Sequence, residues 1–348
     1  MLARNYFFFG LLLLPAVHYA QETTVHGFGH TEVALNNDDF SFKLGELDLF
    51  IASDLNDNFS VLGEIVYKFS SESATLFNVS IERLVIKYNF HGNHNLLVGK
   101  RHTPVDYWND SYHHGRLFFP TIDRPVLFSF VPIHTLGVSL QAQNLGAYNL
   151  GYDIMIGNGM SSSDVKDFDK PKSLTISLNY KPKTGTQLRL AYYRDKLLNN
   201  SSGIHTGHSK HGNVLSAYSG DVSYQLYTLS IASFNPKFEF LSEVIMNKNK
   251  TDTLGVATNM GLFLYAGYRF KKIVPYVAFD ISKIDPNDLH FPSKNLVGIS
   301  FGARYEINYL VALKMEYKLK YIGDPIEGKF WDNKSFKDEI KIQLAIGF

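Results

Sequence analysis

The chain has 348 residues, of which 45% are hydrophobic and 14% aromatic, with 21 Tyr and 27 Phe. The formal net charge of +1 gives no electrostatic basis for a nucleic-acid partner. Because the chain has no Cys, disulfides, thiolate metal sites and a lipid-modified N-terminal Cys are excluded.

The first twenty residues have the pattern of a secretory signal peptide. Arg4 precedes an apolar run over residues 6–17, and the small residue Ala20 precedes the polar Gln21. The run is shorter than the ~20 residues that a membrane-spanning helix needs, which argues against the alternative of an N-terminal anchor helix. We therefore expect residues 1–20 to be a signal peptide of an exported protein and residues 21–348 to form one domain.

After Gln21, segments that alternate between apolar and polar residues are separated by turn-forming residues. This two-residue period predicts β-strands. The sequence predicts sixteen of them, over residues 25–35, 44–52, 59–69, 79–90, 96–101, 136–143, 148–156, 174–181, 187–195, 222–234, 238–247, 258–270, 274–283, 296–306, 309–321 and 336–348.

Short turns and longer loops alternate strictly along the predicted strands. Seven turns are short, and the longest of the other connections covers residues 103–133. Short turns on one side and longer loops on the other are typical of bacterial outer-membrane barrels, which carry an even number of strands. The short turns are centred near Asn56, Gly92, Leu145, Lys183, Asn235, Lys271 and Asn308.

The two faces of the strands favour a membrane barrel over a water-soluble one. Odd positions from Tyr309 to Tyr321 are all apolar or aromatic, while Lys314, Glu316 and Lys318 lie on the other face. A barrel in lipid must be apolar outside and polar inside, whereas a soluble barrel buries its apolar face. The sequence thus predicts an all-β, antiparallel transmembrane barrel of about sixteen strands in the bacterial outer membrane, surrounded by lipid.

The barrel prediction also assigns positions to two further groups of side chains. Aromatic residues beside the short turns predict an interfacial girdle, made of Phe59, Tyr88, Phe90, Tyr148, Tyr180, Phe234, Phe238, Phe270, Tyr305, Tyr309 and Phe348. The predicted lumen-facing charged residues are Glu46, Asp48, Glu64, Arg189, Arg269, Asp280, Arg304, Lys314 and Lys318.

The connection over residues 103–133 is the best candidate for a functional site. It carries charges of both signs among aromatic residues, and its Trp, Tyr and Pro content argues against disorder. We expect it to fold into the lumen and to narrow the pore with opposed charges; the alternative is an external cap over the mouth. The predicted constriction residues are Arg101, His102, Asp106, Asp110, Arg116, Asp123 and Arg124.

A family resemblance appears at the same place. Residues 97–104, Leu-Val-Gly-Lys-Arg-His-Thr-Pro, are similar to the Val-Gly-x-x-x-Thr-Pro segment of phosphate-selective porins and their relatives, and residues 107–115 resemble uncharacterised porin-like proteins. Sixteen strands with the longest loop after the fifth resemble the bacterial porin superfamily. The resemblance implies passive diffusion of small hydrophilic solutes or ions. The predicted lumen carries Glu and Asp as well as Arg and Lys, so anion selectivity does not carry over.

The resemblance also implies two partners of the barrel. The terminal Phe348 resembles the C-terminal aromatic by which the barrel-assembly machinery recognises outer-membrane barrels. Porins of this size often pair their barrel walls, which implies a homotrimer.

Other functions rest on weaker patterns. His205, His208 and His211 are spaced at three residues and His113-His114 are adjacent, but no Cys or carboxylate completes a ligand set between His205 and His211. We expect solvated histidines, no metal and no cofactor.

Two alternatives to a diffusion porin remain. Ser209 and His211 suggest an outer-membrane lipid hydrolase, although both lie in a polar loop; we predict that the protein is not an enzyme. The second alternative is a closed barrel whose external loops bind a ligand.

Overall fold

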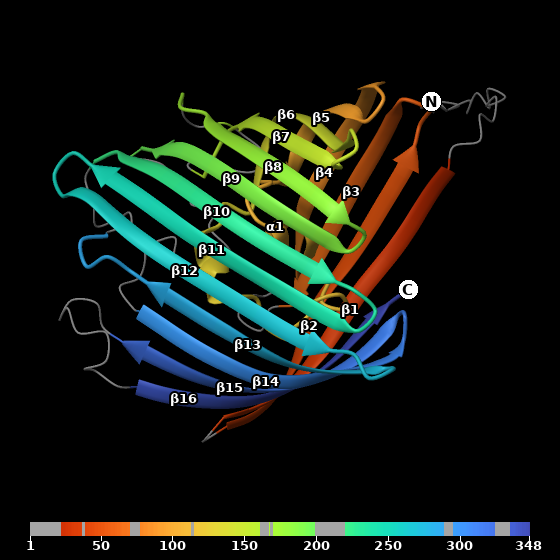
Figure 1. Cartoon of the computed structure of the whole chain (residues 1–348), viewed down its shortest axis with the longest axis vertical. Coiled ribbons are helices and arrows are strands. Elements are labelled where there is room, and N and C mark those ends of the chain that lie inside the picture. The colour runs from red at the N-terminus through yellow and green to blue at the C-terminus, as the bar shows by residue number, and fades with distance from the viewer. Residues whose placement is uncertain are drawn as a thin grey trace, which may run out of the picture.

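The computed structural model describes residues 22–36, 39–69, 77–112, 115–160, 167, 170–198, 220–288, 295–323 and 335–348. Sixteen antiparallel strands form one closed barrel (Figure 1), and each predicted segment overlaps one of them, which confirms the predicted fold class. The strands are β1 (Glu22–Asn36), β2 (Asp39–Asp54), β3 (Phe59–Phe69), β4 (Phe77–His91), β5 (His94–His102), β6 (His134–Leu145), β7 (Leu150–Gly157), β8 (Ser173–Lys183), β9 (Thr186–Leu197), β10 (Val222–Phe234), β11 (Phe238–Thr251), β12 (Gly255–Tyr268), β13 (Ile273–Lys283), β14 (Asn295–Asn308), β15 (Val311–Gly323) and β16 (Ser335–Gly347).

The barrel closes between its first and last strands. Each strand pairs with its neighbours in the chain, and β16 pairs with β1 from Phe28↔Gly347 to Asn36↔Glu339. Gly27 and Phe348 exchange two backbone hydrogen bonds, of 2.7 and 2.9 Å. A Cβ on Gly27 would lie 2.3 Å from the Phe348 ring, so glycine leaves room for this ring against the first strand.

The two ends of the barrel differ. The seven short turns and both the start of β1 and Phe348 lie at one end, which we call the short-turn end (Figure 1). At the other end, the connections were all predicted to be longer loops, and this prediction is wrong for two of them. Only two residues separate β1 from β2, and three separate β11 from β12. Among the described residues, no helix is long and apolar enough to cross a membrane.

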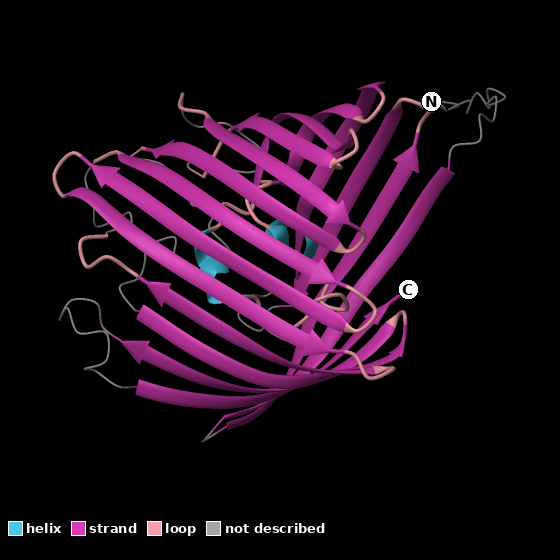
Figure 2. Cartoon of the chain, in the orientation of Figure 1, coloured by secondary structure: helices cyan, strands magenta, loops and turns pink. Residues whose placement is uncertain are grey.

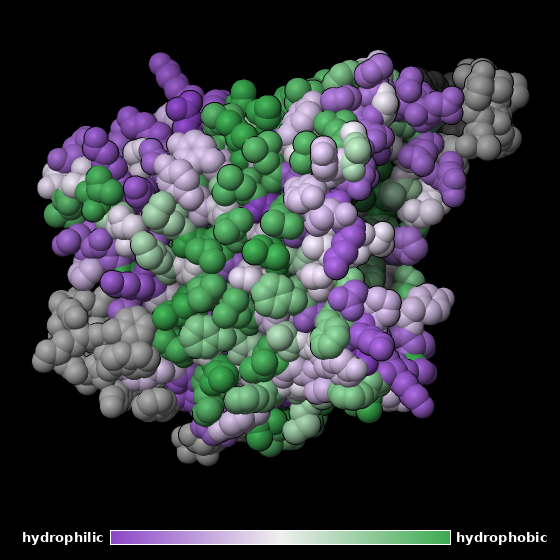
Figure 3. Space-filling view, in the orientation of Figure 1, coloured by the Kyte–Doolittle hydropathy of each residue, from purple (hydrophilic) through white to green (hydrophobic). Residues whose placement is uncertain are grey.

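The outer surface is apolar around the middle of the barrel. A hydrophobic belt crosses the face seen in Figure 3, with hydrophilic residues at both ends. Ten of the eleven predicted girdle aromatics are exposed, but Phe234 is partly buried and packs inward. Tyr321 is also buried, which breaks the outward alternation predicted for β15.

The interior contains the chain between β5 and β6. This segment includes α1 (Tyr107–Tyr112) and the 3-10 helix η1 (Val126–Phe130), which lie inside the barrel in Figure 2. The main hydrophobic core is formed by side chains of this segment together with inward residues of β9–β13. The core of the molecule is therefore the interface between this segment and one side of the barrel wall.

Candidate functional site

The segment 103–133, called here the inner loop, is closed at its base by hydrogen bonds. The Thr103 N–H donates to the Ile133 carbonyl at 2.9 Å, and the Asn109 side-chain amide donates to the carbonyls of Thr103 and Ile133 at 2.9 and 2.8 Å. Just before the loop, Gly99 has φ +133°, and a Cβ there would lie 2.0 Å from the Leu84 carbonyl oxygen. The Val-Gly-x-x-x-Thr-Pro pattern therefore supplies a glycine for close strand packing and a threonine that closes the loop.

A carboxylate on the barrel wall holds the start of α1. Glu243 on β11 accepts hydrogen bonds from the N–H groups of Tyr107 and Trp108 at 2.8 and 3.0 Å. Asp106 caps the same helix by accepting from the Asn109 N–H at 2.7 Å. The first N–H groups of a helix have no partner within it, so these two carboxylates satisfy donors that would otherwise be buried without an acceptor.

Other wall side chains bind the loop backbone in the same way. Asp280 accepts from the Val126 N–H at 3.0 Å, and Glu316 accepts from the Ile122 N–H at 3.2 Å. Lys314 donates to the Arg116 carbonyl at 2.5 Å. Hydrogen bonds to charged carboxylates such as Asp280 and Glu316 contribute on the order of 1.5–3 kcal/mol each. Polar residues of the wall thus fix the path of the loop.

The inner loop reaches two sides of the barrel. On one side Trp108, fully buried, contacts Phe119 and the Phe263 ring of β12 at centroid distances of 5.1 and 5.5 Å. On the other side Phe118 meets the Phe28 ring of β1 at 5.2 Å, and Leu117 packs with Ala312 and Ala345 of β15 and β16. The loop therefore crosses the interior from β12 to β1.

Two adjoining cavities remain between the loop and strands β1–β6, and we call them the β1–β6 cavities. The larger, about 490 Å³, extends toward the short-turn end, and the smaller, about 320 Å³, lies against the loop. Five residues line both, namely Ala52, Leu62, Arg83, His102 and Asp110. Cations and carboxylates are equally numerous in the larger cavity, with Arg83, Lys87 and Arg101 facing Glu22, Asp54 and Asp110.

A third cavity lies on the opposite side of the loop, at the short-turn end of β8–β14. Its volume is about 790 Å³, and we call it the basic cavity because Lys181, Lys183, Arg269 and Arg304 line it with the single carboxylate Glu239. Tyr112 and Phe118 of the loop line both this cavity and the smaller β1–β6 cavity, so they form the partition between them.

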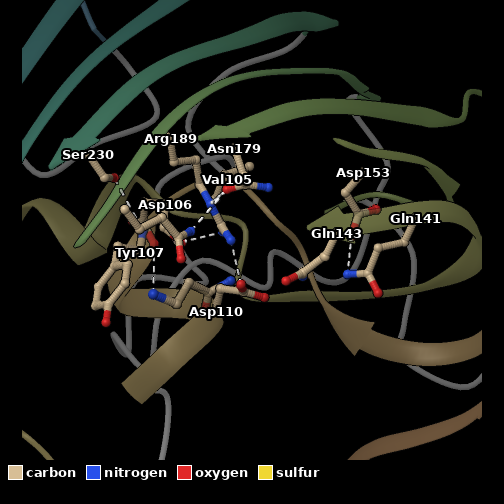
Figure 4. A network of polar contacts seen from close by, with 12 residues as sticks. Val105, Asp106, Tyr107, Asp110, Gln141, Gln143, Asp153, Asn179, Arg189 and Ser230 are labelled. Carbon is tan, nitrogen blue, oxygen red and sulfur yellow. Dashed lines mark hydrogen bonds and ion pairs between the residues drawn. The ribbon is translucent and has the colours of Figure 1, made fainter. Parts of the chain in front are cut away.

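Three of the predicted constriction residues lie together at the β1–β6 cavities. Arg101 donates to Asp153 and to Ser139, both at 2.8 Å, and His102 lines both cavities. Asp110 forms an ion pair with Arg189 at 2.5 Å (Figure 4). Burial would raise the pKa of Asp110, but the guanidinium groups of Arg189 and Arg101 outweigh it and hold the pKa below its usual value.

The other four predicted constriction residues have different surroundings. Asp106 was predicted to line an open pore, but its side chain has no exposed surface. It caps α1 instead. Arg116 and Arg124 lie over the Phe119 ring at 4.8 and 5.7 Å, which is cation–π geometry. Asp123 is bonded to Lys341 at 2.9 Å.

The charges around these loop residues shift their protonation in opposite directions. Burial and the nearby Glu243 raise the pKa of Asp106 well above its usual value. Burial would also raise the pKa of Asp123, but the ammonium groups of Lys341 and Lys318 outweigh it and lower the pKa.

The predicted lumen-facing charges mostly contact one another or the loop. Arg269 and Arg304 both bind Glu239, at 2.8 and 2.7 Å, and Lys318 binds Asp280 at 3.1 Å. Arg189 binds the loop carbonyl of Asp106 as well as Asp110, and Lys314 and Asp280 hold the loop as described above. Of the rest, Glu64 pairs with Arg83, Asp48 is buried and Glu46 is half-buried.

Sequence reasoning missed two important residues. Glu243 is one acidic residue among many along a strand, and its partner α1 lies more than a hundred positions away. Arg83 was missed because β4 has a bulge: Glu64 pairs with Arg83 but Ile65 pairs with Ile81. The bulge upsets the two-residue alternation, and no residue pattern marks it.

The residues of two other hypotheses, the metal-binding histidines and the lipid hydrolase, lie outside the part of the chain that the structure describes. These residues are the histidines 113, 114, 205, 208 and 211, and Ser209. In the part of the chain that the structure describes, no group of three or more His, Asp or Glu side chains is arranged to hold a metal ion.

Comparisons with known proteins agree on the fold alone. No family model and no curated protein matches the chain. The chain is similar in structure to the anion-selective porin from Comamonas acidovorans (TM-score 0.65, 13% identity) and to OmpT, an outer membrane protein of Vibrio cholerae in trimer form (TM-score 0.64, 11% identity), with 94% of this chain and 100% of each of those chains covered. The outer membrane channel DcaP of Acinetobacter baumannii is also similar (TM-score 0.62, 11% identity), with 94% of this chain and 97% of that chain covered. The chain has the fold of sixteen-stranded outer-membrane barrels.

Proposed function

We propose that the protein is an outer-membrane porin through which small hydrophilic solutes and ions diffuse passively. The observation that carries the proposal is a closed sixteen-stranded barrel, apolar outside, in which the β1–β6 cavities remain open beside the inner loop. A barrel of this strand number is wide enough to hold an aqueous channel, and a loop crossing its interior narrows that channel.

In this proposal the solute passes along β1–β6, where Arg83 and Arg101 of the wall face Asp110 of the loop. Each of these charges already has an opposite partner, so the charge filter is weak. A preference for phosphate is not part of the proposal, because carboxylates match the cations along this route. The role of Arg101, His102 and Asp110 as constriction residues belongs to the proposal as well.

The membrane placement is part of the same proposal. Residues 1–20 direct export, the short-turn end faces the periplasm of a Gram-negative cell, and Phe348 serves as the signal for the barrel-assembly machinery. The trimer form of the similar Vibrio cholerae protein supports a homotrimer here. The aromatic residues exposed beside the short turns support a position at the lipid–water interface.

The direct test is ion conductance of the purified, folded protein in a planar lipid bilayer. We expect discrete current steps. A folded barrel that gives no current above background would overturn the proposal and would favour a closed barrel with ligand-binding loops. Hydrolysis of lipid that is lost on Ser209→Ala would instead establish the enzyme alternative.

A further inference from the structure

The basic cavity differs from the β1–β6 cavities in both charge and shape. Four cations and one carboxylate line it, and even when Glu306, bonded to both arginines, is counted, cations outnumber carboxylates by two. In the larger β1–β6 cavity the two signs balance. The net positive charge is therefore concentrated on the side of the loop that the proposed route does not use.

The cations of the basic cavity are of two kinds. Arg269 and Arg304 each form ion pairs with Glu239 and Glu306, so carboxylates already balance their charges. Lys183 is exposed, and Lys181 is half-buried with its ammonium group 2.7 Å from the side-chain oxygen of the uncharged Gln143. The lysine charges are thus not neutralised by a carboxylate in these contacts, and they can bind an anion that enters from the short-turn end.

Aromatic rings form the inner wall of the same cavity. Tyr107 lies 5.6 Å from Tyr112 and 6.2 Å from Phe234, the residue whose inward position the sequence did not predict. Burial raises the pKa of both tyrosines, so their phenol groups stay neutral and can donate hydrogen bonds. Cations beside neutral aromatic faces suit a planar ligand that carries a negative group.

The helix α1 supplies part of the cavity lining. Tyr107 and Tyr112 line it, whereas Trp108 and Asn109 of the same short helix are fully buried. The turn residues Thr184, Gly185 and Asn235 also line it, at the short-turn end. Its volume of about 790 Å³ falls in the range of small-molecule sites.

We propose that the basic cavity is a binding site for small aromatic carboxylates, which enter from the short-turn end and contact Lys181 and Lys183 with the carboxylate and Tyr107, Tyr112 and Phe234 with the ring. This site is separate from the diffusion route, so it does not depend on the proposed porin function.

Trp108 provides the measurement, because it lies 5.3 Å from the Tyr112 ring and the chain has only one other Trp, Trp331. In a Trp331→Phe background, benzoate should change Trp108 fluorescence in a saturable manner. Acetate and benzylammonium should bind more weakly, since one lacks the ring and the other the negative charge.

Variants locate the site. The double change Lys181→Gln/Lys183→Gln should weaken benzoate binding by about tenfold, as expected when two partly exposed charges are lost. The matched control Lys248→Gln/Lys250→Gln removes the same charge from the far end of β11, outside all three cavities, and should leave binding unchanged. Heat-dependent migration in detergent gels checks that each barrel is folded.

Three results would each overturn the inference: no saturable response to benzoate, equal binding of benzylammonium, or a response in the Lys181→Gln/Lys183→Gln variant equal to that of the control. Because none of these measurements uses ion current, a failure of the porin proposal would be seen separately.

Discussion

Replacing Glu243 by Ala should detach the start of α1 from the barrel wall. The carboxylate accepts from the N–H groups of Tyr107 and Trp108 at 2.8 and 3.0 Å. Tyr107 keeps a second acceptor, the Ser230 hydroxyl at 3.2 Å, so the main loss is at the Trp108 N–H. A buried N–H left without an acceptor costs about 1–3 kcal/mol.

The Glu243 carboxylate also repels the ionised form of its neighbour Asp106, and the substitution removes this repulsion. We therefore expect a net weakening of the docked loop by about 1.4 kcal/mol, which corresponds to about a tenfold increase in the detached population. Hydrogen exchange of backbone amides in residues 103–112, followed by mass spectrometry, measures that population directly.

Two controls define this experiment. Glu243→Gln keeps a side-chain oxygen as acceptor and should give a smaller increase in exchange. Glu306→Ala removes a carboxylate that binds Arg269 and Arg304 but no loop backbone, so exchange in residues 103–112 should not change. If Glu243→Ala exchanges at the wild-type rate while the barrel stays folded, the wall carboxylates do not hold the loop.

Three further predictions concern the loop and the closure of the barrel. Because the pKa of Asp106 is raised by burial and Glu243, the docked loop binds a proton more tightly than a detached loop, and docking should strengthen as pH falls from neutral toward the usual carboxyl range near about 4. Acrylamide quenching of Trp108 in the Trp331→Phe variant should decrease over this window; an increase would contradict the assignment. Gly99→Ala should lower the yield of folded barrel, since the Cβ would lie 2.0 Å from the Leu84 carbonyl oxygen, whereas Gly63→Ala, whose nearest neighbour lies 4.0 Å away, should fold normally; equal yields would refute the packing argument. Deleting Phe348 removes two hydrogen bonds to Gly27 and should reduce the amount of barrel in the membrane more than the current per channel; normal membrane levels would count against its role in assembly.

The strands could be predicted because their signal is local. Residues that alternate along β15 face lipid and interior in turn, so Leu313 is exposed while Lys314 is buried, and this alternation is visible in the sequence itself. The girdle prediction failed at Phe234 because it rested on the place of that residue beside a short turn. Phe234 continues the even positions of β10, which face the interior, and there its ring contacts Tyr107 and Tyr112 of the loop.

The candidate site was only partly predictable because its contacts join distant parts of the chain. Composition indicated that residues 103–133 contain charged and aromatic side chains, but not which charges would become enclosed. Asp106 and Asp110 are four residues apart on one short segment, yet Asp106 is fully buried and caps a helix while Asp110 lines the β1–β6 cavities. The difference arises from Glu243 and Arg189, whose positions depend on the closed barrel.

The central claim is that ions pass along the β1–β6 cavities, and the absence of cysteine from the chain makes it testable at single positions. Ala52 lines both β1–β6 cavities, whereas Thr186 lines only the basic cavity among the three described above. Current through Ala52→Cys channels in a planar bilayer should fall when a bulky thiol reagent is added, and current through Thr186→Cys channels should not. Absence of any current, or block at Thr186→Cys but not at Ala52→Cys, would contradict this account.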